Sequence, residues 1–124
     1  MIDHLGITVV DVAASRAFYV QALEPLGVKV MMEFDTPGGP VIGMGTPDRP
    51  FFWLSRGAAP QHTHLALQAQ NRAAVDAFYA AAMAAGAKDN GGPGLRPDYH
   101  PNYYGAFVID LNGINLEAVC HTPE

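Results

Sequence analysis

The sequence has a single cysteine among its 124 residues, which excludes an internal disulfide framework. Cys120 is therefore expected to be a small buried hydrophobe in a strand rather than a nucleophile. Basic residues are also scarce, since Lys and Arg total 7, form no cluster and leave a formal net charge of −5. A nucleic-acid surface needs a basic patch, so no nucleic-acid partner is expected.

Long apolar runs are missing as well. No stretch approaches the roughly 20 apolar residues of a membrane-spanning helix, and no basic leader with a following apolar run opens the sequence. We therefore expect a cytoplasmic protein without a membrane partner. Hydrophobic residues nevertheless make up 49% of the chain, which suits one compact domain over residues 1–124.

The sequence contains an internal repeat. One copy reads "DHLGITVVDVAASRAFYVQALEPLG" and the other "THLALQAQNRAAVDAFYAAAMAAG". His4 of the first copy corresponds to His64 of the second, and an Ala-Phe-Tyr triplet follows at the same distance in both. We interpret this as a duplication with one module over residues 1–57 and a second over residues 61–122.

Each module shows the same order of hydrophobic periods. In the first, the periods predict a strand over 2–10, a helix over 15–26 ended by Gly27, and strands over 28–34, 40–44 and 51–56. In the second, they predict a strand over 64–69, a helix over 73–85 ended by Gly86, and strands over 104–110 and 114–121. The Asn-Gly between the last two strands favours a type I′ turn. The predicted fold is α+β, with two βαβββ repeats forming a curled, half-open mixed-sheet barrel around a cleft and the helices outside.

Alternation along the last strand places one carboxylate in the cleft. Glu117 shares a face with Asn115, Val119 and His121, whereas the other face of this strand is apolar. A mid-strand carboxylate that is desolvated without a partner costs several kcal/mol or more. We therefore expect Glu117 to be bound to another group.

His4 and His64 are the candidate partners of Glu117, because a pseudo-twofold relating the modules would bring equivalent strands together. Two imidazoles and one carboxylate form a facial triad that leaves positions open on a divalent metal such as iron, manganese or zinc. Taken singly, a histidine at the start of a strand is usually a surface residue or a satisfied core residue. His62 competes with His64 for the role, and we expect His62 to be an exposed residue at the strand entrance.

These motifs resemble those of the vicinal oxygen chelate superfamily, which contains glyoxalase I, bleomycin-resistance proteins and extradiol dioxygenases. "HLGITVVD" resembles its first-strand signature, "HLAL" the third-module counterpart, and "DLNGINLEAVCH" the terminal hairpin, so the resemblance covers essentially the whole chain. It implies that His4, His64 and Glu117 are the metal ligands and that the cofactor is a divalent ion (Fe, Mn, Zn or Ni). It also implies a homodimer.

Two departures from the family pattern matter for the chemistry. The family hairpin usually has Pro-Asp where this chain has Leu111-Asn112, which leaves Glu117 in register. Glyoxalase I also has a fourth ligand on the last strand of the first module, and that strand here, "FFWLSR", contains no acid, His or Cys. The resemblance therefore argues against glyoxalase I chemistry proper.

The segment "DNGGPGLRPDYHPNY" is predicted to be a loop beside the metal. A loop of more than about 12–15 residues in a compact domain is usually functional or disordered, and its aromatic residues argue against disorder. We interpret it as a lid in which Tyr99, His100 and Tyr103 donate or shuttle protons and Arg96 holds an anionic substrate group. A structural loop pinned by stacked aromatic residues and prolines is the alternative. The aromatic strand residues Phe51, Phe52 and Trp53 are expected in the core.

Two classes of function remain open at the level of sequence. The first is a metal-dependent enzyme on a small substrate with two adjacent oxygens, by lyase or isomerase chemistry or by dioxygenase chemistry. Glu117, Tyr99, His100 and Tyr103 are its candidate catalytic residues. The second is a metal-free protein that sequesters a small molecule or antibiotic, as bleomycin-resistance proteins do. A fold relic with an empty site is a third reading.

Overall fold

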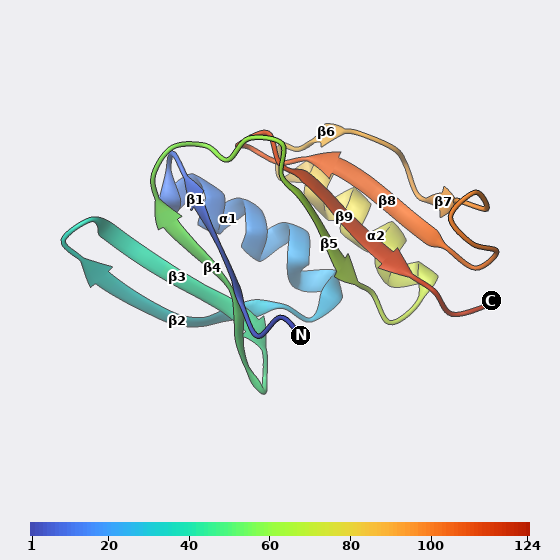
Figure 1. The fold of residues 1–124 in the computed structure, drawn as a ribbon, viewed down its shortest axis with the longest axis horizontal. Coiled ribbons are helices and arrows are strands. Elements are labelled where there is room, and N and C mark those ends of the chain that lie inside the picture. The colour runs from blue at the N-terminus through green and yellow to red at the C-terminus, as the bar shows by residue number, and fades with distance from the viewer.

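Each half of the chain folds into its own sheet with one helix against it (Figure 1). A computed structural model describes residues 1–124. The first half contains, in chain order, β1 (Leu5–Val9), α1 (Val12–Leu23), a 3-10 turn (Glu24–Leu26), β2 (Lys29–Thr36), β3 (Gly39–Thr46) and β4 (Arg49–Arg56). The second half contains β5 (His64–Gln68), α2 (Arg72–Ala84), β6 (Lys88–Asp89), β7 (Gly94–Leu95), β8 (Tyr104–Ile109) and β9 (Asn115–Cys120).

Both sheets are mixed and neither closes. The first sheet has the order β1-β4-β3-β2, and the second has the order β5-β9-β8-β6, with β7 also paired to β8. In each sheet the first strand of the half pairs in parallel with the last, and the remaining pairs are antiparallel. The predicted α+β class and the half-open arrangement of two βαβββ units are thereby confirmed.

The helices repeat the duplication in three dimensions. The Asp11 side chain accepts a hydrogen bond from the backbone N–H of Ala14 at 3.0 Å, and the Asn71 side chain accepts one from Ala74 at 2.8 Å. These N-caps satisfy backbone donors of the first turn and start the helices at residues 12 and 72. The sequence prediction began both helices too late because it did not include the caps.

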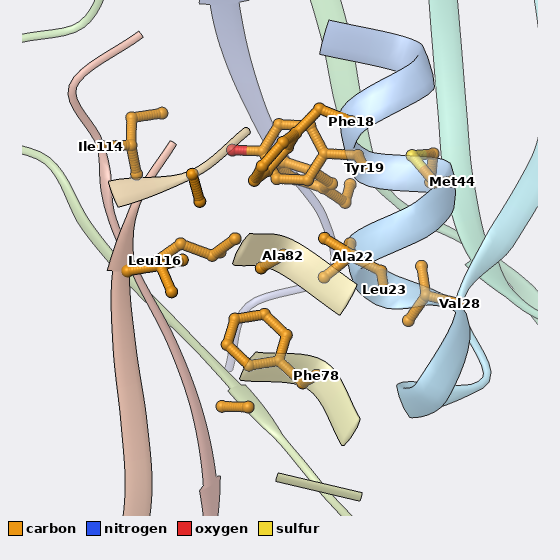
Figure 2. Close-up of a cluster of buried hydrophobic side chains, with 14 of the residues drawn as sticks. Phe18, Tyr19, Ala22, Leu23, Val28, Met44, Phe78, Ala82, Ile114 and Leu116 are labelled. Carbon is orange, nitrogen blue, oxygen red and sulfur yellow. The ribbon is translucent and has the colours of Figure 1, made fainter. Parts of the chain in front are cut away.

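The two helices share one hydrophobic core between the sheets (Figure 2). Phe18 and Leu23 of α1 and Phe78 of α2 are at most 2% exposed, and they meet apolar side chains of both sheets, including Leu116 of β9. Cys120 is fully buried and unpaired, as expected. Neither helix has the length and apolar character that crossing a membrane would need.

The hairpin between β8 and β9 differs from the predicted type I′ turn. That turn requires positive φ at both central residues, but in this hairpin only Gly113 has it, at 88°. One carboxylate oxygen of Asp110 instead accepts from the N–H groups of Asn112 and Ile114, each at 2.8 Å. The prediction of the turn type was wrong because the Asp110 side chain, rather than the Asn-Gly pair, organises this loop.

A buried hydrogen bond joins the hairpin to the first half. The Tyr19 hydroxyl on α1 donates to the second carboxylate oxygen of Asp110 at 2.5 Å, and both residues are at most 5% exposed. Burial, and after it the Asp110 charge, raise the pKa of Tyr19, so its hydroxyl is the donor. This contact fixes the two halves relative to each other.

The faces of the sheets away from the helices are open. Both helices lie on the same side of the strands, so the opposite face of each sheet is left uncovered (Figure 1). Trp53 lies on the open face of the first sheet and stacks on Phe34, with ring centroids 5.9 Å apart. The prediction that Trp53 belongs to the core is therefore wrong, whereas Phe52 is buried as expected and Phe51 packs partly against the core.

Candidate functional site

The open face of the second sheet carries a buried carboxylate paired with a histidine. Parallel pairing of β5 with β9 places Ala66 opposite Glu117, so His64 and Glu117 lie on the same face of neighbouring strands. His64 Nε2 is 2.8 Å from Glu117 Oε1. Glu117 is only 1% exposed, whereas half of the His64 side chain (52%) is open to solvent. The expectation that Glu117 binds another group is met by this pair.

Tyr103 covers the other oxygen of the carboxylate. Its hydroxyl donates a hydrogen bond to Glu117 Oε2. Burial, and after it the hydrogen bond to Glu117, raise the pKa of Tyr103 above its usual value near 10. The hydroxyl thus keeps its proton at neutral pH.

Gly105 makes room for this contact. A Cβ at that position would lie 3.2 Å from Tyr103 Cε1 and 3.3 Å from Glu117 Oε2, which is tighter than ordinary packing. The absence of a side chain at position 105 thus lets the phenol ring reach the carboxylate. Each oxygen of Glu117 therefore has one side-chain partner, His64 or Tyr103.

The predicted lid is hydrogen-bonded to the edge of the second sheet. β6 and β7 both pair with β8, and the Arg96 and Tyr103 backbones are joined at 2.7 Å. Phe107 also exchanges backbone hydrogen bonds with residues 90 and 91. These bonds agree with the structural interpretation of the segment, and its proposed role as a lid stays a prediction.

Arg96 lies next to the open face without an acidic partner. Its guanidinium lies 5.3 Å from the Phe107 ring centroid and donates to the carbonyls of Gly94 at 2.9 Å and Gly92 at 2.8 Å. None of the four ion pairs in the chain involves it. It lines a hollow of about 290 Å³ together with Tyr99 and other residues. The remaining guanidinium N–H groups are therefore free to bind an anion.

His100 and His121 lie together beside Tyr103. His100 Nε2 is within hydrogen-bond distance of His121 Nδ1, and both imidazoles pack edge-on against the Tyr103 ring. Tyr99 packs on the same ring with centroids 4.9 Å apart, and it is 63% exposed. Sequence reasoning placed His121 on the face of Glu117 by alternation but gave it no role. Its partner became evident only from the path of the loop that carries His100.

His4, the third predicted ligand, is not joined to the pair of His64 and Glu117. It is exposed, and its Nδ1 lies 2.8 Å from Asp3 Oδ1. Asp3 is held in turn by Arg49 at 2.6 Å. Within the chain no group of three or more His, Cys, Asp or Glu side chains is placed to hold a metal ion. The structure thus brings two of the three predicted ligands together.

His62 lies just before β5, which begins at His64. It is exposed, in agreement with the expectation, and has a positive φ of 50°. The left-handed region is uncommon for residues other than glycine, although histidine is among the enriched exceptions.

The first sheet has a tryptophan where the second has its glutamate. β1 pairs with β4 so that Gly6 lies opposite Trp53, and β5 pairs with β9 so that Ala66 lies opposite Glu117. Gly6 and Ala66 are equivalent in the repeat, so Trp53 is the structural counterpart of Glu117. The strand "FFWLSR" therefore has a tryptophan, which cannot bind a metal as a carboxylate does, at the position equivalent to Glu117.

Known proteins share this architecture. The family model described as Glyoxalase/Bleomycin resistance protein/Dioxygenase superfamily matches residues 1–118. No curated protein matches the sequence at a significant level. A glyoxalase/bleomycin resistance protein from Albidiferax ferrireducens T118 superposes with a TM-score of 0.80 at 23% identity, covering 98% of this chain and 99% of the other.

The structures of FosX and of a glyoxalase I are also similar to this fold. The fosfomycin resistance protein FosX from Listeria monocytogenes, an E126Q mutant in complex with Mn(II) and 1S,2S-dihydroxypropylphosphonic acid, gives a TM-score of 0.73 at 16% identity, covering 98% of this chain and 90% of that one. An E144Q mutant of glyoxalase I from Zea mays gives 0.73 at 21% identity, covering 95% of this chain and 46% of that one. Identities this low show the fold alone. Because the family model spans nearly the whole sequence, the chain belongs to the glyoxalase/bleomycin resistance protein/dioxygenase superfamily.

Proposed function

We propose that the protein is a metal-dependent enzyme acting on a small substrate with two adjacent oxygens. One observation carries this proposal: a carboxylate that is 1% exposed faces the open side of a sheet, where a histidine nitrogen lies 2.8 Å away. A buried carboxylate and an imidazole are oxygen and nitrogen donors that suit iron, manganese, zinc or nickel. The FosX complex with Mn(II) and a vicinal diol supports this choice within the superfamily.

The proposed ligands are His64 and Glu117 of one chain and His4 of a second copy. His4 lies apart from the other two, and its Nδ1 faces the Asp3 carboxylate, which leaves Nε2 free to bind a metal. The bound ion would polarise the substrate oxygens as a Lewis acid. Pairing two chains through their open sheet faces would bring His4 to the other chain's histidine and glutamate and would cover exposed apolar residues such as Phe34. Homodimerisation and a cytoplasmic location stay predictions.

Arg96 is the proposed anchor for an anionic group of the substrate. Its free guanidinium N–H groups border the hollow next to Phe107, and Phe107 also contacts the ring of His64, with centroids 6.1 Å apart. A substrate held at Arg96 would therefore extend along Phe107 towards the histidine. We assign proton transfer to the Tyr103 hydroxyl and Glu117, with Tyr99 of the same segment as a further proton donor.

The strand that carries Trp53 argues against a four-ligand metal site of the glyoxalase I type. Glyoxalase I has a fourth protein ligand on the strand that carries Trp53 in this chain, and this strand contains no acid, His or Cys, so a three-ligand site is the proposed form. Three ligands leave open positions for a bidentate substrate, as in lyase or isomerase chemistry, and for dioxygen in addition, as in dioxygenase chemistry.

Metal binding and its composition test this function. We expect untagged protein to bind about one Mn²⁺ per chain in calorimetry, and His4→Ala, His64→Ala and Glu117→Gln each to weaken binding, whereas His62→Ala leaves it unchanged. Mixing His4→Ala chains with His64→Ala chains should restore part of the tight binding, because a mixed dimer has one site with intact ligands. Unchanged Mn²⁺ binding in His64→Ala and Glu117→Gln would overturn the proposed site.

A metal-free binding protein is the second candidate. The stacked Trp53 and Phe34 rings on an open face favour it, because aromatic surfaces of this kind bind planar apolar ligands. In that case the protein would bind such ligands equally well with a chelator present, and Trp53→Ala would abolish binding while His64→Ala would not.

A further inference from the structure

The interaction of His100 with His121 has no part in the proposed metal site or in substrate binding. His121 follows the last residue of β9, and His100 lies in the turn between β7 and β8. The two rings are nearly coplanar, with an interplanar angle of 25° and centroids 4.7 Å apart. Such an arrangement is that of a direct N–H···N hydrogen bond, in which one ring donates and the other accepts.

The hydrogen bonds around His100 decide which ring is the donor. His100 Nδ1 accepts from the backbone N–H of Asn102 at 3.1 Å, and a backbone N–H can only donate. Nδ1 therefore has no proton, and the neutral ring has its proton on Nε2. His100 Nε2 thus donates to His121 Nδ1, and the proton of neutral His121 is on its own Nε2. One peptide group fixes the tautomer of both rings.

The histidine pair supports the ring of Tyr103. The centroid of Tyr103 lies 5.4 Å from that of His100 and 5.2 Å from that of His121, with both rings nearly perpendicular to it. Tyr99 packs on the same ring, and the Tyr103 hydroxyl reaches Glu117. The phenol therefore lies between the pair and the carboxylate, so a displacement of either imidazole would move the Tyr103 hydroxyl.

We propose that His100 and His121 are positioning residues that, as a neutral hydrogen-bonded pair, hold Tyr103 on Glu117, and that protonation of the pair releases Tyr103. The part that concerns metal affinity rests on the function proposed above. Supporting groups that orient a metal ligand typically change metal affinity by about 10–100-fold when they are lost. Glu117 has no other side-chain partner on Oε2, so the pair would act on the metal site through Tyr103.

Protonation breaks the pair on either side. A proton on His100 Nδ1 would face the Asn102 N–H, and a proton on His121 Nδ1 would face the N–H of His100, so two donors would meet in both cases. The titratable group that contacts both imidazoles is Tyr103. Tyr99 and Glu117 in turn contact the ring and the hydroxyl of Tyr103. None of the four ion pairs of the chain includes His100 or His121. Neither imidazole is therefore paired with an acidic side chain that would stabilise its protonated form.

Imidazole nitrogen NMR of the metal-free protein tests the pair without any assumption about the metal. We expect both His100 and His121 in the Nε2–H tautomer at about pH 8. Lowering the pH from about 8 to about 5 should give one transition that is shared by the His100 and His121 signals, and the Tyr103 ring signals should shift with it. His62 is the internal reference, and a change in its imidazole signals should not be accompanied by a shift of the Tyr103 ring signals. An Nδ1–H tautomer at His100, or Tyr103 signals that ignore both titrations, would overturn the proposal.

A non-titratable replacement of the pair connects it to the metal site. In the double variant His100→Gln/His121→Asn, the Gln amide N–H and the Asn carbonyl take the places of donor and acceptor. We expect His121→Ala to weaken Mn²⁺ binding by about 10–100-fold at pH 8, the double variant to regain most of that loss, and its affinity to depend less steeply on pH than that of the wild type. His62→Asn, which suits a positive φ, is the matched control.

The outcomes separate this inference from the function on which it rests. If the wild type binds no Mn²⁺ but the NMR transition is shared by His100, His121 and Tyr103, the metal proposal fails and the positioning of Tyr103 stands. If Mn²⁺ binds tightly and His121→Ala binds it as well as the wild type, the inference fails and the metal site stands. A second equivalent of Mn²⁺ that is lost in His121→Ala would show that the pair is itself a metal site and would also overturn the inference.

Discussion

Replacing Tyr103 by phenylalanine removes the hydroxyl that donates to Glu117 and leaves the packing of the ring in place. Glu117 is 1% exposed, so water cannot take over the bond to Oε2. A hydrogen bond to a charged group contributes about 1.5–3 kcal/mol, and an unpaired buried acceptor retains its desolvation penalty. We therefore expect Tyr103→Phe to lower the free energy of unfolding by about 2 kcal/mol, or a shift of about 1 M in the urea midpoint at a typical slope.

Tyr104→Phe is the matched control, because the adjacent tyrosine points to the other face of β8. Its hydroxyl donates to Asp76 at 2.6 Å in an exposed setting, so water can replace it and the loss should be clearly smaller. Urea unfolding of the metal-free variants, followed by circular dichroism, measures both values, and an unchanged slope shows that the two-state comparison holds. If Tyr103→Phe is no less stable than Tyr104→Phe, the assignment of a buried Tyr103–Glu117 hydrogen bond is refuted.

Three further predictions follow from the same contacts. Gly105→Ala should weaken Mn²⁺ binding, since its Cβ would meet Tyr103 and Glu117 at 3.2 and 3.3 Å, and Gly92→Ala, where a Cβ meets nothing within 4 Å, should not; equal affinities in calorimetry would contradict this. Tyr19→Phe should lower the free energy of unfolding by about 1–3 kcal/mol, because it leaves the buried Asp110 without its donor; no loss in urea unfolding would contradict the link between the halves. Alkaline pH should also destabilise the fold, because the pKa values of Tyr19 and Tyr103 are raised in the folded state. The stabilisation from both hydroxyls is therefore fully present below about pH 10 and falls as the pH rises further. A Tyr19→Phe/Tyr103→Phe variant should lose stability less steeply than the wild type across that range.

The fold could be predicted from the sequence because equivalent residues of the two repeats have the same structural role in both. Phe18 and Phe78 are both buried, and both helices are followed by a glycine with positive φ: Gly27 caps the 3-10 turn after α1, and Gly86 follows α2. The type of the hairpin turn could not be predicted from Asn-Gly alone. Asp110 precedes that pair, and its side chain accepts hydrogen bonds from the backbone N–H groups of Asn112 and Ile114. These bonds hold the loop in a conformation other than a type I′ turn.

The site could be predicted only where alternation and repeat register decide the outcome. Glu117 and His64 followed from register, since paired strands place equivalent positions side by side. The partners of Tyr103 could not be predicted, because they depend on the path of a glycine- and proline-rich segment that has no periodicity. Trp53 was misplaced for a related reason: strand propensity favours an aromatic residue in β4 but does not say which face of the sheet it occupies.

The two halves differ where their chemistry would lie, and this difference bears on how chains can pair. Each half retains a histidine at the same register position, but Glu117 in the second half corresponds to Trp53 in the first. A twofold dimer that joined like faces would place two carboxylates in one site and none in the other, with repulsion in the first. A dimer that joined unlike faces would give two identical sites, each with two histidines, one carboxylate and one indole. In the proposed dimer, the distribution of charge between the halves would favour pairing of unlike faces, which is the arrangement that mixing His4→Ala with His64→Ala chains would detect.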